Sequence, residues 1–223
     1  MSKSDPSATS SGPIPNHTRS AETRAAILEA AARIFAEGGL AGARTEAIAE
    51  AAGVNKALLY YYFKNKEALY FAAIEAHLMG FTAEAMKVLT AEGSPRTVLL
   101  NYVSMHFDFI SQSMDCAPLY QQLMMNGDDS MTDLLRRFVI PRSQALQNVL
   151  ERGMQCGEFR PADKVHTSVS IIALIVFYFT SAPVFQKLGH SNSYSETNLQ
   201  RRKQEAIDFI RYGIFTDPNA PLP

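Results

Sequence analysis

The chain has 223 residues, of which 47% are hydrophobic and 19% charged, and its formal net charge is -1. This is the composition of a folded globular protein and excludes the polar, highly charged composition typical of disorder. Because the net charge is close to zero, any nucleic-acid binding must depend on a local basic patch. Cys116 and Cys156 have neither metal-site nor redox-motif spacing, which favours a reducing cytoplasm and leaves a redox switch as the alternative.

Two segments are relevant to export and membrane insertion. The opening MSKSDPSATSSGPIPN lacks the basic and apolar regions of a signal peptide and is expected to be a flexible tail over residues 1–19. The longest apolar run, Val169–Phe179, is too short for the ~20 residues that span a bilayer. We therefore predict a buried helix there, a cytoplasmic protein and no membrane partner.

After residue 19 almost every segment has apolar residues at a spacing near 3.6, which predicts an all-α protein of about nine helices. Glycine and proline residues separate the predicted helices. The first is expected over Ser20–Glu37, ended by Gly38 and Gly39. Beyond the amino-terminal region, helices are expected over residues 96–113, 118–126, 130–156, 163–179 and 196–215.

Two short helices with a glycine between them follow the first helix. Thr45 is predicted to cap one, which ends at Gly53, and Asn55 to cap the next, over residues 56–62. Asn65 is expected to cap a fourth helix that connects two domains, with Gly80 as a possible break. A helix, a tight turn and a second short helix form a helix-turn-helix, whose second helix enters the DNA major groove.

Basic and aromatic residues gather around this second short helix. Lys56, Lys64 and Lys66 add three positive charges before the first acid, Glu67. Lysine and tyrosine side chains bind phosphate oxygens, and helix amino termini favour phosphate as well. From composition alone, however, the run Tyr60–Phe63 fits an aromatic core segment equally well, so DNA binding and plain packing both remain open at this point.

The stretch from Thr23 to about Glu75 resembles the amino-terminal domain of the TetR (tetracycline-repressor-like) family of transcriptional regulators. The resemblance rests on F-A-E-G-G at the end of the first helix, T-x-x-x-I-A-x-x-A-G-V through the second, and L-Y-Y-Y-F-K-N-K-E-A-L through the third and fourth. It implies a helix-turn-helix domain over residues 20–66, a helical ligand-binding and dimerisation domain over 67–216, and a tail over 217–223.

The resemblance also implies a set of DNA-binding residues. Arg44 and Thr45 would hold the DNA backbone at the start of the second helix, and Lys66 would hold a phosphate. The positions of the recognition helix that face DNA would be Lys56, Ala57, Leu58, Tyr60, Tyr61 and Tyr62. Many members have small or polar residues where this chain has Lys56-Ala57-Leu58, so base preference cannot be taken from a relative.

The last two predicted helices are candidates for a dimer interface. The segment Val165–Tyr178 is apolar nearly all round and must be covered on several sides. Together with the final helix it could form half of a four-helix bundle across a two-fold axis, as the resemblance implies. We therefore predict a homodimer, with a central core helix of a monomer as the alternative.

A ligand pocket is expected in the second domain, for a small apolar or aromatic effector. Methionine and aromatic side chains provide adaptable, extensive contacts, and a few polar groups fix orientation. Each of these residues is also an ordinary core residue. The predicted lining consists of Met105, His106, Phe109, Tyr120, Met124, Phe138, Arg142, His166, Phe177 and Tyr178, with His106 or Arg142 as polar anchor.

Two other classes of function are alternatives to a ligand-responsive repressor. An enzyme is disfavoured because the five histidines are dispersed and the sequence has no zinc-site, di-iron, phosphate-loop or nucleophile-elbow motif, so no metal or cofactor is predicted. A DNA-binding adaptor or activator whose second domain binds a protein stays open. The resemblance favours a repressor that binds a palindromic operator. Binding of an effector would release this repressor from DNA through a movement of the connecting helix.

Overall fold

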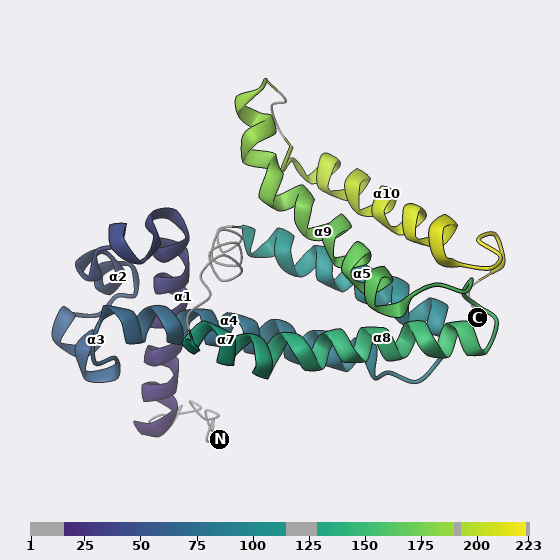
Figure 1. Cartoon of the computed structure of the whole chain (residues 1–223). Helices are drawn as coiled ribbons and strands as arrows, with labels where there is room; N and C mark the ends of the chain where they lie inside the picture. Colours follow the sequence, from purple (N-terminus) through teal and green to yellow (C-terminus); the bar gives the residue numbers. More distant parts are fainter. Residues whose placement is uncertain (1–15, 115–128, 190–192, 222–223) are drawn as a thin grey trace, which may run out of the picture.

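The computed structural model describes residues 16–114, 129–189 and 193–221. Its regular elements are helices, and the described residues add one isolated antiparallel bridge, between Phe159 and Phe215. The predicted all-α class is therefore confirmed. Figure 1 shows the first three helices gathered at one end of the molecule and the carboxyl terminus at the opposite end.

Helices α1 (Asn16–Gly42), α2 (Thr45–Ala51) and α3 (Lys56–Tyr62) form the amino-terminal unit. Gly53 has a φ of 65° in the turn between α2 and α3, which is why glycine is needed there. The side chain of Asn55 accepts a hydrogen bond from the Leu58 amide, and that of Asn65 accepts one from Ala68. Both predicted caps are confirmed, and they fix where α3 and the following helix start.

Two local predictions in this unit have different outcomes. The predicted end of the first helix at Gly38 and Gly39 is confirmed, because Gly39, with φ 63° and ψ -175°, interrupts the regular helix before a short second piece that reaches Gly42. The predicted capping role of Thr45 is wrong. Thr45 does not cap α2, because Arg44 occupies the N-cap position without a side-chain cap bond. The Thr45 side chain is buried instead, with its hydroxyl 3.4 Å from that of Tyr60. Thr45 therefore packs against α3 and does not cap α2.

Helix α4 (Lys66–Leu89) connects the two ends of the molecule and continues through Gly80 without a break. Its first half, as far as Leu78, packs with α1, α2 and α3 in one hydrophobic core. Its last turns, from Ala85, belong to a second core with the carboxyl-terminal helices. Phe81 is buried between these two sets, so one helix is a structural part of both ends.

The carboxyl-terminal helices are α5 (Pro95–Gln112), α7 (Asp129–Leu134), α8 (Ile140–Gln155), α9 (Lys164–Lys187) and α10 (Glu196–Ile214). A π-helical segment, η2 (Leu135–Val139), joins α7 to α8, so the long helix predicted over 130–156 contains one wide turn. Pro141 follows it, and a proline ring inside a helix displaces the preceding turn. The helix predicted over 118–126 lies outside the described residues.

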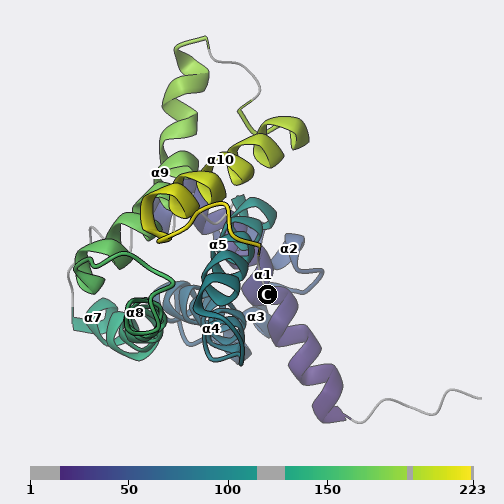
Figure 2. The same ribbon diagram turned by 90° about the vertical axis from the view of Figure 1, so that its right-hand side faces the viewer.

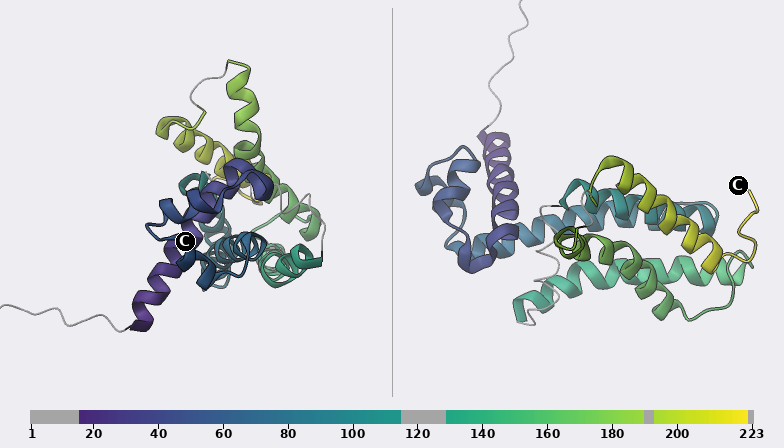
Figure 3. Two further views of the ribbon diagram at one scale, coloured as in Figure 1. Left: turned by 90° about the vertical axis from the view of Figure 1, so that its left-hand side faces the viewer. Right: turned by 90° about the horizontal axis from the view of Figure 1, so that it is seen from above.

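Helices α9 and α10 lie together on one side of α5, as Figures 2 and 3 show from different directions. With 24 residues and a hydropathy of 2.0 over its most apolar window, α9 is long and apolar enough to cross a membrane by length and composition alone. The helix extends to Lys187, beyond the predicted end at Phe179. Only 25% of that window is buried, so the prediction of a buried helix is wrong for a single chain.

Candidate nucleic-acid interface and ligand site

Helix α3, the predicted recognition helix, presents an exposed polar and aromatic surface. Leu59 is fully buried and Phe63 nearly so, and they anchor the helix on the amino-terminal core. Tyr61 is 80% exposed and Tyr60 40% exposed, although large aromatic side chains are usually buried. Ala57 is exposed beside them, and Leu58 is half-buried. The helix therefore keeps two tyrosines available for contact with another molecule.

Lys56, at the start of α3, forms an ion pair across the helix-turn-helix. Its Nζ lies 2.5 Å from Glu46 Oε1 on α2 and 5.9 Å from the centre of the Tyr60 ring. The hydrogen bond and the opposite charge lower the pKa of Glu46 and raise that of Lys56, so both are charged at neutral pH. Both side chains are about half exposed, so the pair is open to competition from a phosphate.

Other predicted DNA contacts also bond within the protein. Lys66 is half-buried, and its Nζ donates to the carbonyl oxygens of Ala43, at 3.2 Å, and Ala41, at 3.5 Å, beyond the kink of α1. The hydroxyl of Tyr62 lies 2.9 Å from that of Ser20. These bonds join α1 to α3 and α4. Arg44 is exposed ahead of α2, and the DNA roles of all these residues stay predictions.

A buried polar cluster lies where α4, α5 and α8 pack against one another. Arg142, 8% exposed on α8, lies over Phe81 with its guanidinium carbon 4.3 Å from the ring centre. The His106 ring of α5 lies against the same Phe81 ring, with 4.5 Å between centroids. One helical turn earlier on α5, Tyr102 approaches His106 at 5.5 Å. Three helices thus bring a cation, an imidazole and a phenol together.

The polar atoms of this cluster differ in how they are bonded. Arg142 donates to the Thr82 hydroxyl at 3.4 Å. Tyr102 Oη and His106 Nδ1 are buried and have no hydrogen-bond partner in the described parts of the chain. Burial and the nearby Arg142 charge lower the pKa of His106 to about 3, and burial raises that of Tyr102 to about 12. Both side chains are therefore neutral at pH 7.

The predicted ligand residues separate into two groups. Phe109 packs against Phe81 at 4.9 Å, and the Phe138 carbonyl accepts from Thr82, so both adjoin the cluster. Met105, on α5, lines with Phe109 a surface groove of about 450 Å³. Outside this group are His166, exposed between α9 and α10, Phe177, 65% exposed, and Tyr178, which donates to the Ser193 carbonyl. Tyr120 and Met124 lie outside the described residues.

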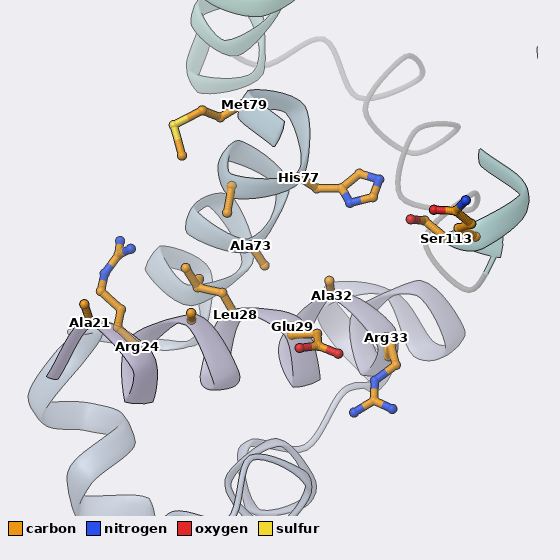
Figure 4. A pocket seen from close by; sticks show the side chains of 13 residues that line it. Ala21, Arg24, Leu28, Glu29, Ala32, Arg33, Ala73, His77, Met79 and Ser113 are labelled. Carbon is orange, nitrogen blue, oxygen red and sulfur yellow. The ribbon is translucent and has the colours of Figure 1, made fainter. Parts of the chain in front are cut away.

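Sequence reasoning missed two features of this region. Tyr102 was not predicted as a ligand residue, although its i, i+4 spacing from His106 places both on one face of a helix. A groove of about 530 Å³ between α1, α4 and the end of α5 was not foreseen either. Figure 4 shows His77 projecting from α4 toward Ser113, above Leu28 and Ala32 of α1. His77 also approaches Phe109 at 5.2 Å.

Two family models match the chain. Residues 27–73 match "Bacterial regulatory proteins, tetR family", and residues 95–210 match "Tetracyclin repressor-like, C-terminal domain". The second match alone covers more than half of the 223 residues. The first contains α2, α3 and the start of α4, the elements that present the exposed tyrosines and lysines.

Known proteins resemble the chain over most of its length. The HTH-type transcriptional regulator RutR of Escherichia coli is 28% identical over 193 residues, which are 85% of this chain and 89% of RutR. A transcriptional regulator from Saccharomonospora viridis, solved with choline, superposes with a TM-score of 0.72 at 21% identity, covering 88% of this chain and 100% of that one.

The regulator FadR from Bacillus subtilis, solved with stearoyl-CoA, has a TM-score of 0.67 at 19% identity and covers 83% and 96% of the two chains. At these identities the two structures show that the fold is shared. Combined with both family models and the exposed helix-turn-helix, they identify the chain as a member of the TetR family and a DNA-binding transcriptional regulator.

Proposed function

We propose that the chain is a cytoplasmic repressor that binds a palindromic operator as a homodimer and releases it when a small effector binds. The exposed face of α3 is the observation that supports the DNA role most directly. Tyr60 and Tyr61 project from a helix that is anchored by Leu59, with Lys56 at its amino end. Such a surface suits phosphate contacts together with base-edge contacts in the major groove.

The proposed dimer interface consists of α9 and α10. Most of the exposed large apolar side chains in the described residues lie on or directly beside these two helices, and a groove of about 310 Å³ separates them. Exposed apolar side chains that gather on two neighbouring helices are a feature of interaction sites. To bind two half-sites, a two-fold axis here must place two α3 helices on successive major grooves, about 34 to 36 Å apart. The interface residues include Val165, Val169, Phe177, Val184, Phe209 and Tyr212.

The ligand-binding role is proposed for the carboxyl-terminal domain, with α4 as the connection to DNA. Solved relatives that share this fold contain choline or stearoyl-CoA. In this chain the buried polar cluster contacts α4 through Phe81, and α4 also belongs to the amino-terminal core. An effector that favours one packing of Phe81 would therefore favour one position of α3. We propose that this domain binds its effector without catalysing a reaction and without a cofactor.

The proposed amino-terminal unit covers residues 20–66, with one refinement from the packing. Because the first core includes α4 as far as Leu78, the first turns of α4 are expected to move with α3. The remaining helices, to residue 216, would form the ligand and dimer domain. The alternative, a protein-binding adaptor or activator, would bind the same operator without release by a small molecule.

Fluorescence anisotropy with DNA fragments from beside the chain's own gene tests the proposal, with random DNA as competitor and salt varied. We expect specific, salt-sensitive binding by a dimer. Tyr61→Ala is expected to weaken specific binding at least about tenfold, since it removes an exposed contact at little cost in folding. Met79→Ala, which truncates an exposed side chain outside α3, is the control.

If Tyr61→Ala binds the operator as tightly as the parent chain does, α3 is not the recognition helix. A second experiment, with a reporter gene placed behind the operator, distinguishes a repressor from an activator. Expression that rises when the regulator gene is deleted supports the repressor, and expression that falls supports the activator.

A further inference from the structure

Two buried polar groups on α5 have no hydrogen-bond partner in the described structure, namely Tyr102 Oη and His106 Nδ1. Tyr102 is fully buried and His106 is 3% exposed. Buried polar groups in native proteins are nearly always hydrogen-bonded, so each exception requires an explanation. Because the two residues are one turn apart on the same helix face, one explanation can account for both.

The charge beside these groups restricts what can satisfy them. Arg142 remains protonated in any protein environment, and it lies against the Phe81 ring that His106 also contacts. His106 and Tyr102 are neutral at pH 7 and can each donate one hydrogen bond, His106 in the tautomer protonated on Nδ1. A permanent cation next to two neutral donors is complementary to an oxyanion.

The surroundings of the polar groups are aromatic. Phe81 packs on His106 at 4.5 Å and on Phe109 at 4.9 Å, with interplanar angles of 43° and 41°. These tilted rings make the surroundings of the two polar groups apolar and aromatic. A planar body attached to the oxyanion would therefore find aromatic contacts on α4 and α5.

We propose that Tyr102, His106 and Arg142 bind the carboxylate, or an equivalent oxyanion, of a planar organic acid that is the effector. The inference depends on the proposed ligand-binding function and specifies its chemical class. The carboxylate accepts hydrogen bonds from Tyr102 Oη and His106 Nδ1 and faces the Arg142 guanidinium. Phe81 and Phe109 contact the planar part. An uncharged isostere leaves the Arg142 charge without this new partner and binds more weakly.

The experiment is calorimetric titration of the full-length protein, without DNA, with benzoate and with its uncharged isostere benzamide. We expect benzoate to bind and benzamide to bind at least about tenfold more weakly, since hydrogen bonds to charged groups exceed neutral ones. Tyr102→Phe is the decisive variant. It removes a hydroxyl that has no partner, so the melting temperature is expected to be maintained while benzoate binding falls about tenfold.

Arg142→Gln is expected to abolish the preference for benzoate over benzamide. Arg152→Gln removes the same charge from an exposed position on the same helix and serves as the matched control. The proposal is overturned if benzoate does not bind, if benzamide binds equally well, if Tyr102→Phe retains full benzoate affinity, or if Arg152→Gln weakens benzoate as much as Arg142→Gln does. None of these results alters operator binding, which the anisotropy experiment measures separately.

Discussion

On the surface proposed to face DNA, the positive charge of Lys56 is paired with the carboxylate of Glu46. Glu46 bonds Lys56 at 2.5 Å, and a phosphate that binds Lys56 must compete with it. In the proposed DNA complex Glu46 would also repel the DNA backbone. We therefore expect the carboxylate to act against non-specific binding, because a random duplex offers phosphates without the base contacts that compensate for the lost ion pair.

The first prediction concerns this pair. Glu46→Gln is expected to tighten binding to random DNA several-fold and to steepen the salt dependence of binding by about one unit, because it releases one cation. Anisotropy titrations at several salt concentrations measure both quantities. Glu92→Gln, an exposed position in the loop before α5, is the control. Equal random-DNA affinity in Glu46→Gln and the parent chain would show that the pair does not limit Lys56.

The second prediction concerns pH. Burial and Arg142 depress the pKa of His106 to about 3 in the folded chain, against an ordinary value of 6.5. The unfolded chain therefore binds more protons between these values, so stability is complete above pH 6.5 and is lost as pH falls toward 3. Between pH 7.5 and 5, we expect a loss of about 2 kcal/mol in the free energy of unfolding from His106 alone.

Urea denaturation at the two pH values measures this loss. His106→Gln is expected to reduce the loss but not to remove it, because burial also lowers the pKa of His77. An unchanged pH dependence in His106→Gln would contradict the assignment of His106 as a buried neutral imidazole.

Single residues show the limit of what the sequence could predict. Asn55 and Asn65 were recognised as caps because capping is local chemistry that a short segment determines. Thr45 fits the same pattern, but packing against Tyr60 gave its side chain another place. Tyr102 was not predicted because its hydroxyl is notable only for being buried without a hydrogen-bond partner. That property depends on how three helices pack together, and a local sequence pattern does not contain it.

At the level of elements, the turn after α8 is fixed by one glycine. Gly153 lies inside α8, and a Cβ added there would lie 2.0 Å from the ring of Phe159. Phe159 in turn stacks on Phe215 at 5.4 Å, nearly parallel, and donates from its amide to the Gly153 carbonyl. This close approach holds the end of α8 against the segment that follows α10.

The third prediction is that Gly153→Ala destabilises the chain by about 3 kcal/mol, because the ring must move out of a filled core. Gly80→Ala is the matched control, since nothing lies within 4 Å of its added Cβ, and we expect a gain of up to about 1 kcal/mol. Thermal melts of both variants check the pair. A neutral Gly153→Ala would mean that Phe159 repacks freely.

Helix boundaries were predictable where glycine, asparagine or proline changes the backbone directly, as at Gly53 and Asn65. The same holds at Gly39, whose φ of 63° and ψ of -175° interrupt the regular helix where the sequence predicts its end. Predictions failed where tertiary packing decides the outcome. In α9, the apolar pattern correctly predicted a helix. It did not predict which surface packs against that helix, since one sequence does not say whether the same chain or a second copy buries it.

At the level of the whole molecule, the fourth prediction concerns assembly. Phe177→Glu places a charge on the exposed apolar face of α9, where a second copy would have to bury it. We expect the dimer dissociation constant to rise about thirtyfold, or ~2 kcal/mol, and operator affinity to fall with it. Sedimentation equilibrium measures the change. Ile140→Glu, at a similarly exposed position on α8, is the control, and a dimer equally stable in both variants would exclude this face.

The sharing of α4 by two cores has a geometric consequence for release from DNA. From Phe81 to Lys66 the helix rises about 22 Å, at 1.5 Å per residue. If α4 pivots at Phe81, a tilt of about 10° moves its amino end by roughly 4 Å, more than the length of a hydrogen bond. Because Lys66 bonds to the end of α1, that displacement reaches the whole amino-terminal unit. In the proposed dimer both units would swing at once, so the distance between the two α3 helices would change by as much as twice that amount and the two major grooves could no longer be occupied together.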